Sequence, residues 1–363
     1  MIRVLQCVNN MHRAGLETML MNYYRNIDRS EIQFDFLTHR PDRADYDDEI
    51  KSMGGKIYYA PRLYPHHYPE YFSYMKRFFA EHPEYKIVHS HIDAMSYLPL
   101  LAAKGAGIPV RIAHSHNTAV DFDFKYPLKR YFQMKLPSAA THYCACGQKA
   151  GEFLFRGRHF DVIPNAIDSG RFLFDPVARK RKREELHIED QIVIGHVGRF
   201  SEQKNHGFLL EIFDRVLQLN PASVLLLIGT GEKEAEMQEK AKKMGLGDRI
   251  RFLGSRSDVN ELYQAMDVFV MPSLYEGVPV VGIEAQFSGL PCVFSDKVPQ
   301  EVCFTSNCKT VSLTVGSQRW AEQIMECGRN DSRAESIRYP HYDIRYAKTL
   351  LENKYKELYR QVL

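Results

Sequence analysis

The chain lacks a strong excess of charge of either sign. Its 363 residues include 48 Lys and Arg against 45 Asp and Glu, a formal net charge of +3. Binding to nucleic acid through a generally basic surface therefore finds no support, because such binding depends on a marked positive field. No run of residues approaches the roughly 18 apolar residues of a membrane span. Any basic or apolar site must therefore be local.

Cysteine pairs with metal-type spacing are also absent. The seven cysteines are scattered, and the close pair Cys144 and Cys146 alternates as residues on one face of a strand do. Small buried apolar residues explain this pattern better than a zinc site or a disulfide. The first residues, MIRVLQCV, have the pattern of a strand and not of a charged-then-apolar leader. We expect a cytoplasmic protein with reduced thiols.

What the sequence does contain is an alternation of strand-like and helix-like segments. A length of 363 residues exceeds the size at which one hydrophobic core keeps growing, so two domains are expected. In the first half, helical patterns separate strand-like runs such as IRVLQCV, IQFDFLT, KIVHSH and VRIAHSH. This alternation predicts an α/β fold with doubly wound parallel sheets, whose ligands bind at the carboxyl ends of the strands.

The segment Asp267–Glu284 is the most informative of these units. It has the pattern of a short apolar strand, a turn containing Gly277, and a helix that opens near Val280. A helix start exposes unpaired N–H groups that attract phosphate, whereas Glu276 and Glu284 require hydroxyl donors. A sugar nucleotide supplies both, a diphosphate for the amides and hydroxyls for the carboxylates.

A basic loop follows an earlier strand. The strand in IVIGHVGRF ends at Val197, Gly198 permits a tight turn, and Arg199 and Lys204 flank the loop before the next helix. Five residues apart, the two cations can converge on one anion. A generic surface loop also carries lysine and arginine, so both interpretations stay open for this loop taken alone.

Together these motifs resemble those of a known enzyme family. Glu276 and Glu284 stand eight residues apart with Gly277 after the first, and the loop has Gly198-Arg199 followed by a lysine. This combination is similar to the retaining glycosyltransferases of family 4. These enzymes have the GT-B fold, two Rossmann-like domains facing each other across a cleft. The resemblance covers nearly the whole chain, with its motifs in the expected order.

The resemblance implies a domain organisation. FDVIPNAID (160–168) resembles the interdomain passage of the family. The implied parts are an acceptor-side domain over 1–165, a nucleotide-sugar-binding domain over 166–340, and a C-terminal helix over 341–363 that packs back on the first domain.

It also implies roles for individual residues. Arg199 and Lys204 would stabilise the departing diphosphate, Glu284 would bind the nucleotide ribose, and Glu276 would face the transferred sugar. The implied donor-binding set is completed by Gly15, Gly198, Ser255, Arg256, Gly277, Val278, Pro279 and Val280.

The loop NNMHRAGLE leads from the first strand into the first helix. Gly15 permits close approach of the backbone to a phosphate, and Glu17 is placed on the acceptor side. The family usually has two glycines before this glutamate, and here the first is Ala14. An ordinary strand-to-helix turn is the alternative.

Four histidines end two successive strands: His89 and His91 in KIVHSH, His114 and His116 in VRIAHSH. Alternate spacing puts each pair on one sheet face, so a four-histidine metal site is conceivable. Acidic or cysteine partners usually accompany such sites, and Asp93 is the one good candidate nearby. We therefore predict no metal. For the first pair, structural and functional roles stay open.

IAHSHN resembles the family strand that ends in a histidine near the transferred sugar. By register this residue is His116, the candidate for catalysis, and His114 is the alternative. Asn117 follows where the family often has an aspartate. A strand-end histidine of this kind would hydrogen-bond sugar hydroxyls.

Three further segments allow simpler interpretations. Residues 58–86 and 121–137 combine aromatic and basic side chains, which could dock on lipid headgroups or lie in the core. The run RKRKR (179–183) stands next to Glu184 and Glu185, which favours a solvated helix face. Asp258 is the expected N-cap of a later helix.

The sequence thus predicts a retaining, metal-independent glycosyltransferase of hexosyltransferase type without a cofactor. It would move a sugar from a nucleotide-diphosphate sugar, in the first place a UDP-sugar, to a glycan or lipid-linked acceptor. The resemblance suggests exopolysaccharide or capsule-type synthesis in the cytoplasm, at the inner face of the membrane, without nucleic acid as a partner.

Two alternatives remain. A sugar-nucleotide epimerase of the same fold would need further acid/base carboxylates. A non-catalytic sugar-nucleotide-binding subunit would not need the intact set of charged residues. A dehydrogenase is least favoured, because Gly229 and Gly231 lack the third glycine of a dinucleotide-binding turn.

Overall fold

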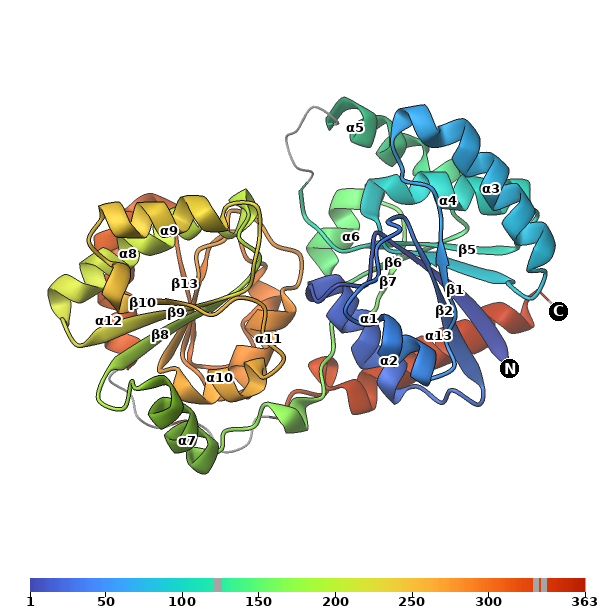
Figure 1. Ribbon diagram of the computed structural model, residues 1–363. Helices are drawn as coiled ribbons and strands as arrows, with labels where there is room; N and C mark the ends of the chain where they lie inside the picture. Colours follow the sequence, from blue (N-terminus) through green and yellow to red (C-terminus); the bar gives the residue numbers. More distant parts are fainter. Residues whose placement is uncertain (120–125, 329–332, 334–337, 363) are drawn as a thin grey trace. The chain divides into compact units, whose positions relative to one another are not determined.

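The computed structural model describes residues 1–119, 126–328, 333 and 338–362. The chain divides into two compact units. Unit 1 comprises Met1–Ala166 with Pro340–Leu363, and unit 2 comprises Ile167–Tyr339. Each unit is a parallel sheet covered by helices (Figure 1).

Unit 1 is built on a seven-stranded sheet in the order β3-β2-β1-β4-β5-β6-β7, with every pairing parallel. The strands are β1 (Ile2–Val8), β2 (Ile32–Thr38), β3 (Ile57–Tyr59), β4 (Ile87–Ser90), β5 (Val110–Ser115), β6 (His142–Ala145) and β7 (Asp161–Val162). The helices are α1 (Gly15–Asn26), α2 (Asp47–Ser52), α3 (Tyr68–Glu81), α4 (Tyr97–Gly105), α5 (Tyr126–Lys135) and α6 (Gln148–Phe155), to which the end of the chain adds α13 (Ile344–Arg360). Helix α13 packs against α1 and β1.

Unit 2 is built on a six-stranded parallel sheet in the order β10-β9-β8-β11-β12-β13. The strands are β8 (Ile192–Val197), β9 (Ser223–Ile228), β10 (Ile250–Phe252), β11 (Val268–Met271), β12 (Cys292–Ser295) and β13 (Cys308–Val311). The helices are α7 (Pro176–Leu186), α8 (His206–Leu219), α9 (Glu234–Lys243), α10 (Val259–Ala265), α11 (Val280–Phe287) and α12 (Gly316–Gly328).

Both sheets have the Rossmann strand order, which confirms the predicted doubly wound fold. In each unit the strand order reverses at one point, between β1 and β4 in unit 1 and between β8 and β11 in unit 2. The loops that leave the carboxyl ends of these strands diverge to opposite faces of the sheet, which makes this position the usual ligand site of such folds. The predicted site residues Gly15, Arg199, Lys204 and Glu276 all lie on these loops or at their ends.

The basic run 179–183 on α7 corrects one expectation. Lys182 and Arg183 are buried, and the prediction of a solvated face is wrong for them. The guanidinium of Arg183 donates to the carbonyl of Ala265, 2.9 Å away, and pairs with Asp267. Arg179 donates to the carbonyl of Met266 at 2.8 Å and also pairs with Asp267. These contacts attach α7 to the turn between α10 and β11, because buried guanidinium groups need acceptors.

The aromatic segments contribute some of their rings to the core, while others are half-buried or exposed. Tyr71, Phe78 and Phe79 of α3 are buried, as is Phe132 of α5. Residues 121–125 of the second segment lie outside the described part of the chain. Among the residues that the structure describes, none of the helices combines the length and the apolar character needed to cross a bilayer.

Candidate functional site

Two loops meet at the switch point of unit 2, one after β8 and one after β11. Nζ of Lys204 lies 2.6 Å from Oε1 of Glu276, and both side chains are largely buried. The neighbours of this lysine add two contacts: Gln203 donates to the carbonyl of Tyr275 at 2.9 Å, and Asn205 donates to the carbonyl of Pro272 at 3.1 Å. The two loops are therefore held together by three consecutive side chains.

Gly198 makes room for this arrangement. A Cβ there would lie 2.9 Å from Nε2 of His196 and 3.3 Å from Cδ of Lys204. A side chain at this position would force the buried His196 ring to move and would crowd the stem of Lys204. The glycine predicted for a tight turn thus has a packing reason as well.

The Gly-x-Gly after β9 has a similar explanation. A Cβ on Gly229 would lie 2.2 Å from the carbonyl oxygen of Gly198, and a Cβ on Gly231 would lie 2.4 Å from that of Phe200. The loops after β8 and β9 therefore touch backbone to backbone. This close contact accounts for both glycines without a dinucleotide.

Arg199 lies differently from Lys204. Its side chain is 70% exposed, and Nη2 lies 2.9 Å from Oε2 of Glu232. The two cations that the sequence predicts to share one anion each pair with a carboxylate here, Glu232 and Glu276. Nothing in the sequence pattern singled out Glu232, which follows the Gly-x-Gly as an ordinary exposed acid.

Glu284 lies buried in α11. The phenol of Tyr263 donates to its Oε2 at 3.0 Å. Burial raises the pKa of Glu284 to about 7, against the opposing effects of the Tyr263 hydrogen bond and the charge of Arg171. This carboxyl therefore changes its charge near neutral pH. Tyr263 carried no sequence signal, because it has the pattern of one apolar residue in a helix.

The segment Gly277–Val280 forms the buried entry to α11. The helix begins at Val280, as predicted, and Pro279 occupies the N-cap position with φ −70°. The carbonyl of Pro279 accepts from the amides of Gly282 and Ile283, so helical bonding starts at once. Val278 completes this entry and is also buried.

The predicted base-facing turn lies after β10. Ser255 is exposed, while Arg256 forms a two-pronged ion pair with Asp258, with Nε–Oδ1 of 2.8 Å and Nη2–Oδ2 of 2.7 Å. Asp258 holds the N-cap position of α10, as predicted, but makes no side-chain cap. Its second partner is Lys182, at 3.0 Å. The hydrogen bond from Arg256 is the largest cause that lowers the pKa of Asp258 to about 2.

In unit 1, Gly15 begins α1 and Glu17, two residues further on, is buried. A Cβ on Gly15 would meet no atom of the described protein within 4 Å. Packing therefore does not require a glycine here, and the space beside it is open to a ligand.

The ends of β4 and β5 come together around Asp93. Its carboxylate accepts from the backbone N–H of His116 and from the side-chain amide of Asn117, both at 2.8 Å. Asp93 itself has a φ of 47°, in the left-handed region that non-glycine residues rarely adopt. The aspartate considered as a metal partner thus holds the segment that carries the candidate catalytic histidine.

The four histidines form one cluster, in which His89, His91 and His114 are buried and His116 is half-buried. The His114 and His116 rings stack with centroids 4.2 Å apart. Potential ligand atoms of His89, His91 and His114 all lie within 4.8 Å of one another, close enough to be considered for a metal ion. Burial lowers the pKa of all four imidazoles below the usual range.

The pair of parallel-sheet units defines a class of protein. Two Rossmann-like units in one chain have the GT-B architecture of glycosyltransferases. The structure is similar, with a TM-score of 0.77 at 18% identity, to Anabaena Alr3699/HepE, solved in complex with UDP-glucose; the match covers 100% of this chain and 98% of that one.

The sequence comparisons name the family. Residues 13–171 match Glycosyltransferase Family 4, and residues 178–340 match Glycosyl transferases group 1. EpsF of Bacillus subtilis is 40% identical over 332 residues, which is 89% of this chain and 86% of that protein. The chain therefore belongs to glycosyltransferase family 4.

One relative is named for its donor and acceptor. The UDP-Gal:α-D-GlcNAc-diphosphoundecaprenol α-1,3-galactosyltransferase of Escherichia coli is 30% identical over 227 residues, covering 59% of this chain and 58% of that protein.

Proposed function

We propose that this enzyme transfers a sugar from a UDP-sugar to a glycan or lipid-linked acceptor in cell-surface polysaccharide synthesis, with retention at the anomeric carbon and without a metal. The observation that carries the proposal is the Lys204–Glu276 pair at the switch point of unit 2. It puts a cation suited to phosphate next to a carboxylate suited to sugar hydroxyls, at the edge where such sheets bind ligands.

Each part of the donor has a matching group in unit 2. The diphosphate is assigned to Arg199, Lys204 and the amides at the start of α11, which supply fixed positive charge. The ribose is assigned to Glu284, the base to Ser255 and Arg256, and the transferred sugar to Glu276. The relatives support the choice of nucleotide, since one was solved with UDP-glucose and another is named for UDP-Gal.

Retention fits a front-face route. Double displacement requires a carboxylate within bonding reach of the anomeric carbon, opposite the leaving phosphate. The unit 1 residues assigned to the sugar, His116 and Asn117, are not usual glycosyl nucleophiles. In the proposed route the sugar–phosphate bond breaks, a phosphate oxygen held by Arg199 and Lys204 takes the acceptor proton, and the acceptor enters on the same face. His116 then stabilises the sugar hydroxyls.

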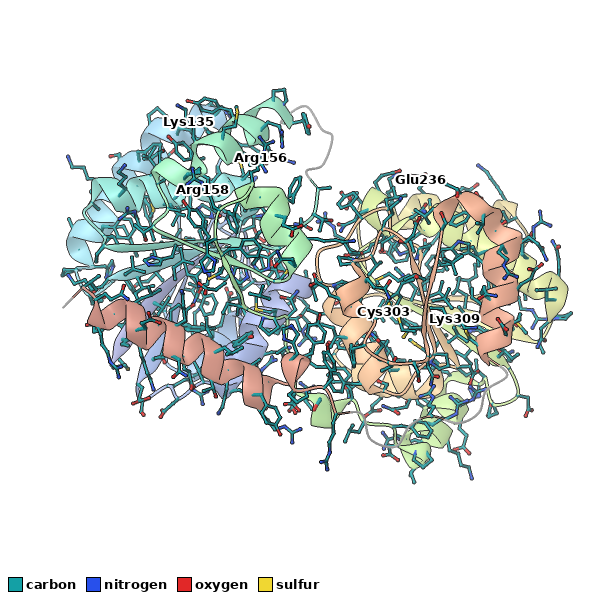
Figure 2. The ribbon with its side chains drawn as sticks, turned by 180° about the vertical axis from the view of Figure 1, so that it is seen from behind. Lys135, Arg156, Arg158, Glu236, Cys303 and Lys309 are labelled. Atoms are coloured by element: carbon teal, nitrogen blue, oxygen red, sulfur yellow. The ribbon has the colours of Figure 1, made fainter. Side chains whose placement is uncertain are left out.

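Helix α5 is proposed to make peripheral contact with a lipid surface that carries the acceptor. Tyr131 and Met134 are exposed on it, and Nζ of Lys135 lies 5.8 Å from the ring centre of Tyr131. Figure 2 shows Lys135 at the end of this helix. Exposed aromatic and basic side chains together favour binding to anionic headgroups. The proposed location of the enzyme is the cytoplasm, at the inner face of the membrane.

Incubation with radiolabelled UDP-sugars tests the main proposal. A thermal-shift screen over UDP-, GDP- and ADP-sugars first selects the donor. Transfer to a lipid-linked acceptor, or slow hydrolysis without one, is the expected result. Release of an epimeric UDP-sugar would favour the epimerase alternative, and binding without turnover would favour a non-catalytic subunit.

A further inference from the structure

A continuous set of hydrogen bonds joins α13 to His116 within unit 1. The hydroxyl of Tyr355 lies 3.1 Å from Nε2 of Gln6 and 2.7 Å from Nδ1 of His89. On the other side of the amide, Oε1 of Gln6 lies 2.8 Å from Nε2 of His91. Nδ1 of His91 then lies 3.0 Å from Nε2 of His116. A branch continues from Nε2 of His89 to the His114 ring, at 3.1 Å.

The rings in this set are neutral. Burial lowers the pKa of His89 and His116 to about 3, and those of His91 and His114 fall well below the usual value. A neutral imidazole has one N–H donor and one lone pair. The position of one proton therefore determines the position of the next.

The amide of Gln6 gives the set its direction. Its Oε1 can only accept, so Nε2 of His91 carries a proton and Nδ1 of His91 accepts one from His116. The amide nitrogen of Gln6, Nε2, can only donate, so the hydroxyl of Tyr355 accepts from it. The single proton of this hydroxyl is then donated to Nδ1 of His89. His89 must then donate from Nε2 to Nδ1 of His114. All four rings share the Nε2–H tautomer.

We propose that Gln6 and His91 are positioning residues that fix His116 as its Nε2–H tautomer and leave Nδ1 as an acceptor for a substrate hydroxyl. The consequence for catalysis rests on the function proposed above for His116, whereas the tautomer does not. Tyr355 contacts the Gln6 amide, so a residue of the last helix is linked through Gln6 and His91 to a residue at the end of β5.

The same geometry argues against a metal at these rings. A ligating nitrogen offers its lone pair to the ion. Here the Nδ1 lone pairs of His89, His91 and His114 already accept from Tyr355, His116 and His89 respectively. In the described structure Nε2 of His114 is buried without a partner, but in this tautomer it is an N–H group.

Nitrogen NMR of the full chain, labelled with ¹⁵N-histidine, tests the tautomers directly. Single substitutions assign the signals. His39 provides a reference of the opposite kind in the same unit, because its Nδ1 lies 2.7 Å from the carbonyl oxygen of Val8 and must donate. We expect Nε2–H signals for His89, His91 and His116. An Nδ1–H signal for His116, or a stoichiometric divalent ion in the purified protein, would overturn the proposal.

Two matched variants test the positioning role. His91→Asn keeps a side-chain oxygen near the place of Nδ1, facing His116, whereas His91→Gln reaches instead toward Gln6. We expect turnover to be roughly tenfold lower in His91→Gln than in His91→Asn, with equal affinity for UDP. Equal turnover in the two variants would overturn the positioning role. Undiminished turnover in His116→Ala would instead refute the function proposed for His116 and leave the NMR result intact.

Discussion

Lys204 and Glu276 form an ion pair with Nζ and Oε1 2.6 Å apart, although they come from loops 72 residues apart in the chain. Glu276 thus balances the positive charge of Lys204 before a sugar nucleotide binds. An incoming diphosphate must therefore share the lysine with a carboxylate, and sugar hydroxyls that donate to Glu276 relieve this competition. We expect phosphate binding and sugar recognition to depend on each other for this reason.

The first prediction concerns the two cations. Arg199→Ala and Lys204→Ala should each raise the activation barrier by roughly 2–4 kcal/mol, the scale of losing one preorganised donor to a developing charge. Steady-state kinetics with the selected UDP-sugar measure this. Lys180→Ala, which removes an exposed lysine of α7, is the control. Complete loss of activity in EDTA, restored by Mn²⁺ or Mg²⁺, would contradict the metal-free mechanism.

A second prediction separates the two glutamates. Glu284→Gln should weaken the binding of UDP itself, because its carboxylate is assigned to the ribose hydroxyls. Glu276→Gln should not weaken UDP binding, because it removes the carboxylate charge that competes with the diphosphate for Lys204, but it should reduce transfer and sugar discrimination. Titration calorimetry with UDP decides between them, and equal losses of affinity would refute this division of roles.

The raised pKa of Glu284 makes stability depend on pH. Folding raises this pKa from 4.5 to about 7, so the folded state favours the protonated form. The stabilising contribution is full below the unfolded pKa and is lost as pH rises through 7. The loss amounts to about 3 kcal/mol. Glu284→Gln, which stays neutral, should become more stable relative to the wild type between pH 5 and pH 8 in denaturant unfolding. A constant difference would show that the carboxyl is not buried as described.

UDP binding should also move a proton at this site. Ribose hydroxyls that donate to Glu284 stabilise its ionised form, so binding between pH 6 and 7 should release a proton. Calorimetry in buffers of different ionisation enthalpy measures the release. The Glu284→Gln variant should show none, and the same proton release in both proteins would assign it to another group.

The stereochemical prediction concerns His116. His116→Ala should lower turnover far more than UDP affinity, and the product should keep the anomeric configuration of the donor. NMR of the product determines the linkage. A β-linked product from an α-linked donor would rule out the retaining mechanism as a whole.

The sequence predicts the backbone of the candidate site better than the contacts of its side chains. The helix start at Val280 was predictable, because a strand, a Pro-Gly turn and an apolar helix leave local signals. The partners of the site residues were not. Glu232 and Tyr263 contact Arg199 and Glu284 only because the fold brings distant loops and helices together. The same holds for Lys182, which in sequence is one more charge on a basic helix but is buried among acids of α7 and α10.

Helix α13 has a consequence for the order in which the chain can fold during synthesis. Unit 2 is one continuous stretch, Ile167–Tyr339, whereas unit 1 needs both ends of the chain. The first 166 residues leave the ribosome without the helix that covers α1 and β1, and Tyr355 arrives only with the last turns of α13. Unit 2 can therefore complete its core first. The sheet of unit 1, although synthesised earlier, keeps an uncovered apolar face until α13 has been made. Until then, Nδ1 of His89 lacks the Tyr355 hydroxyl that contacts it in the complete fold.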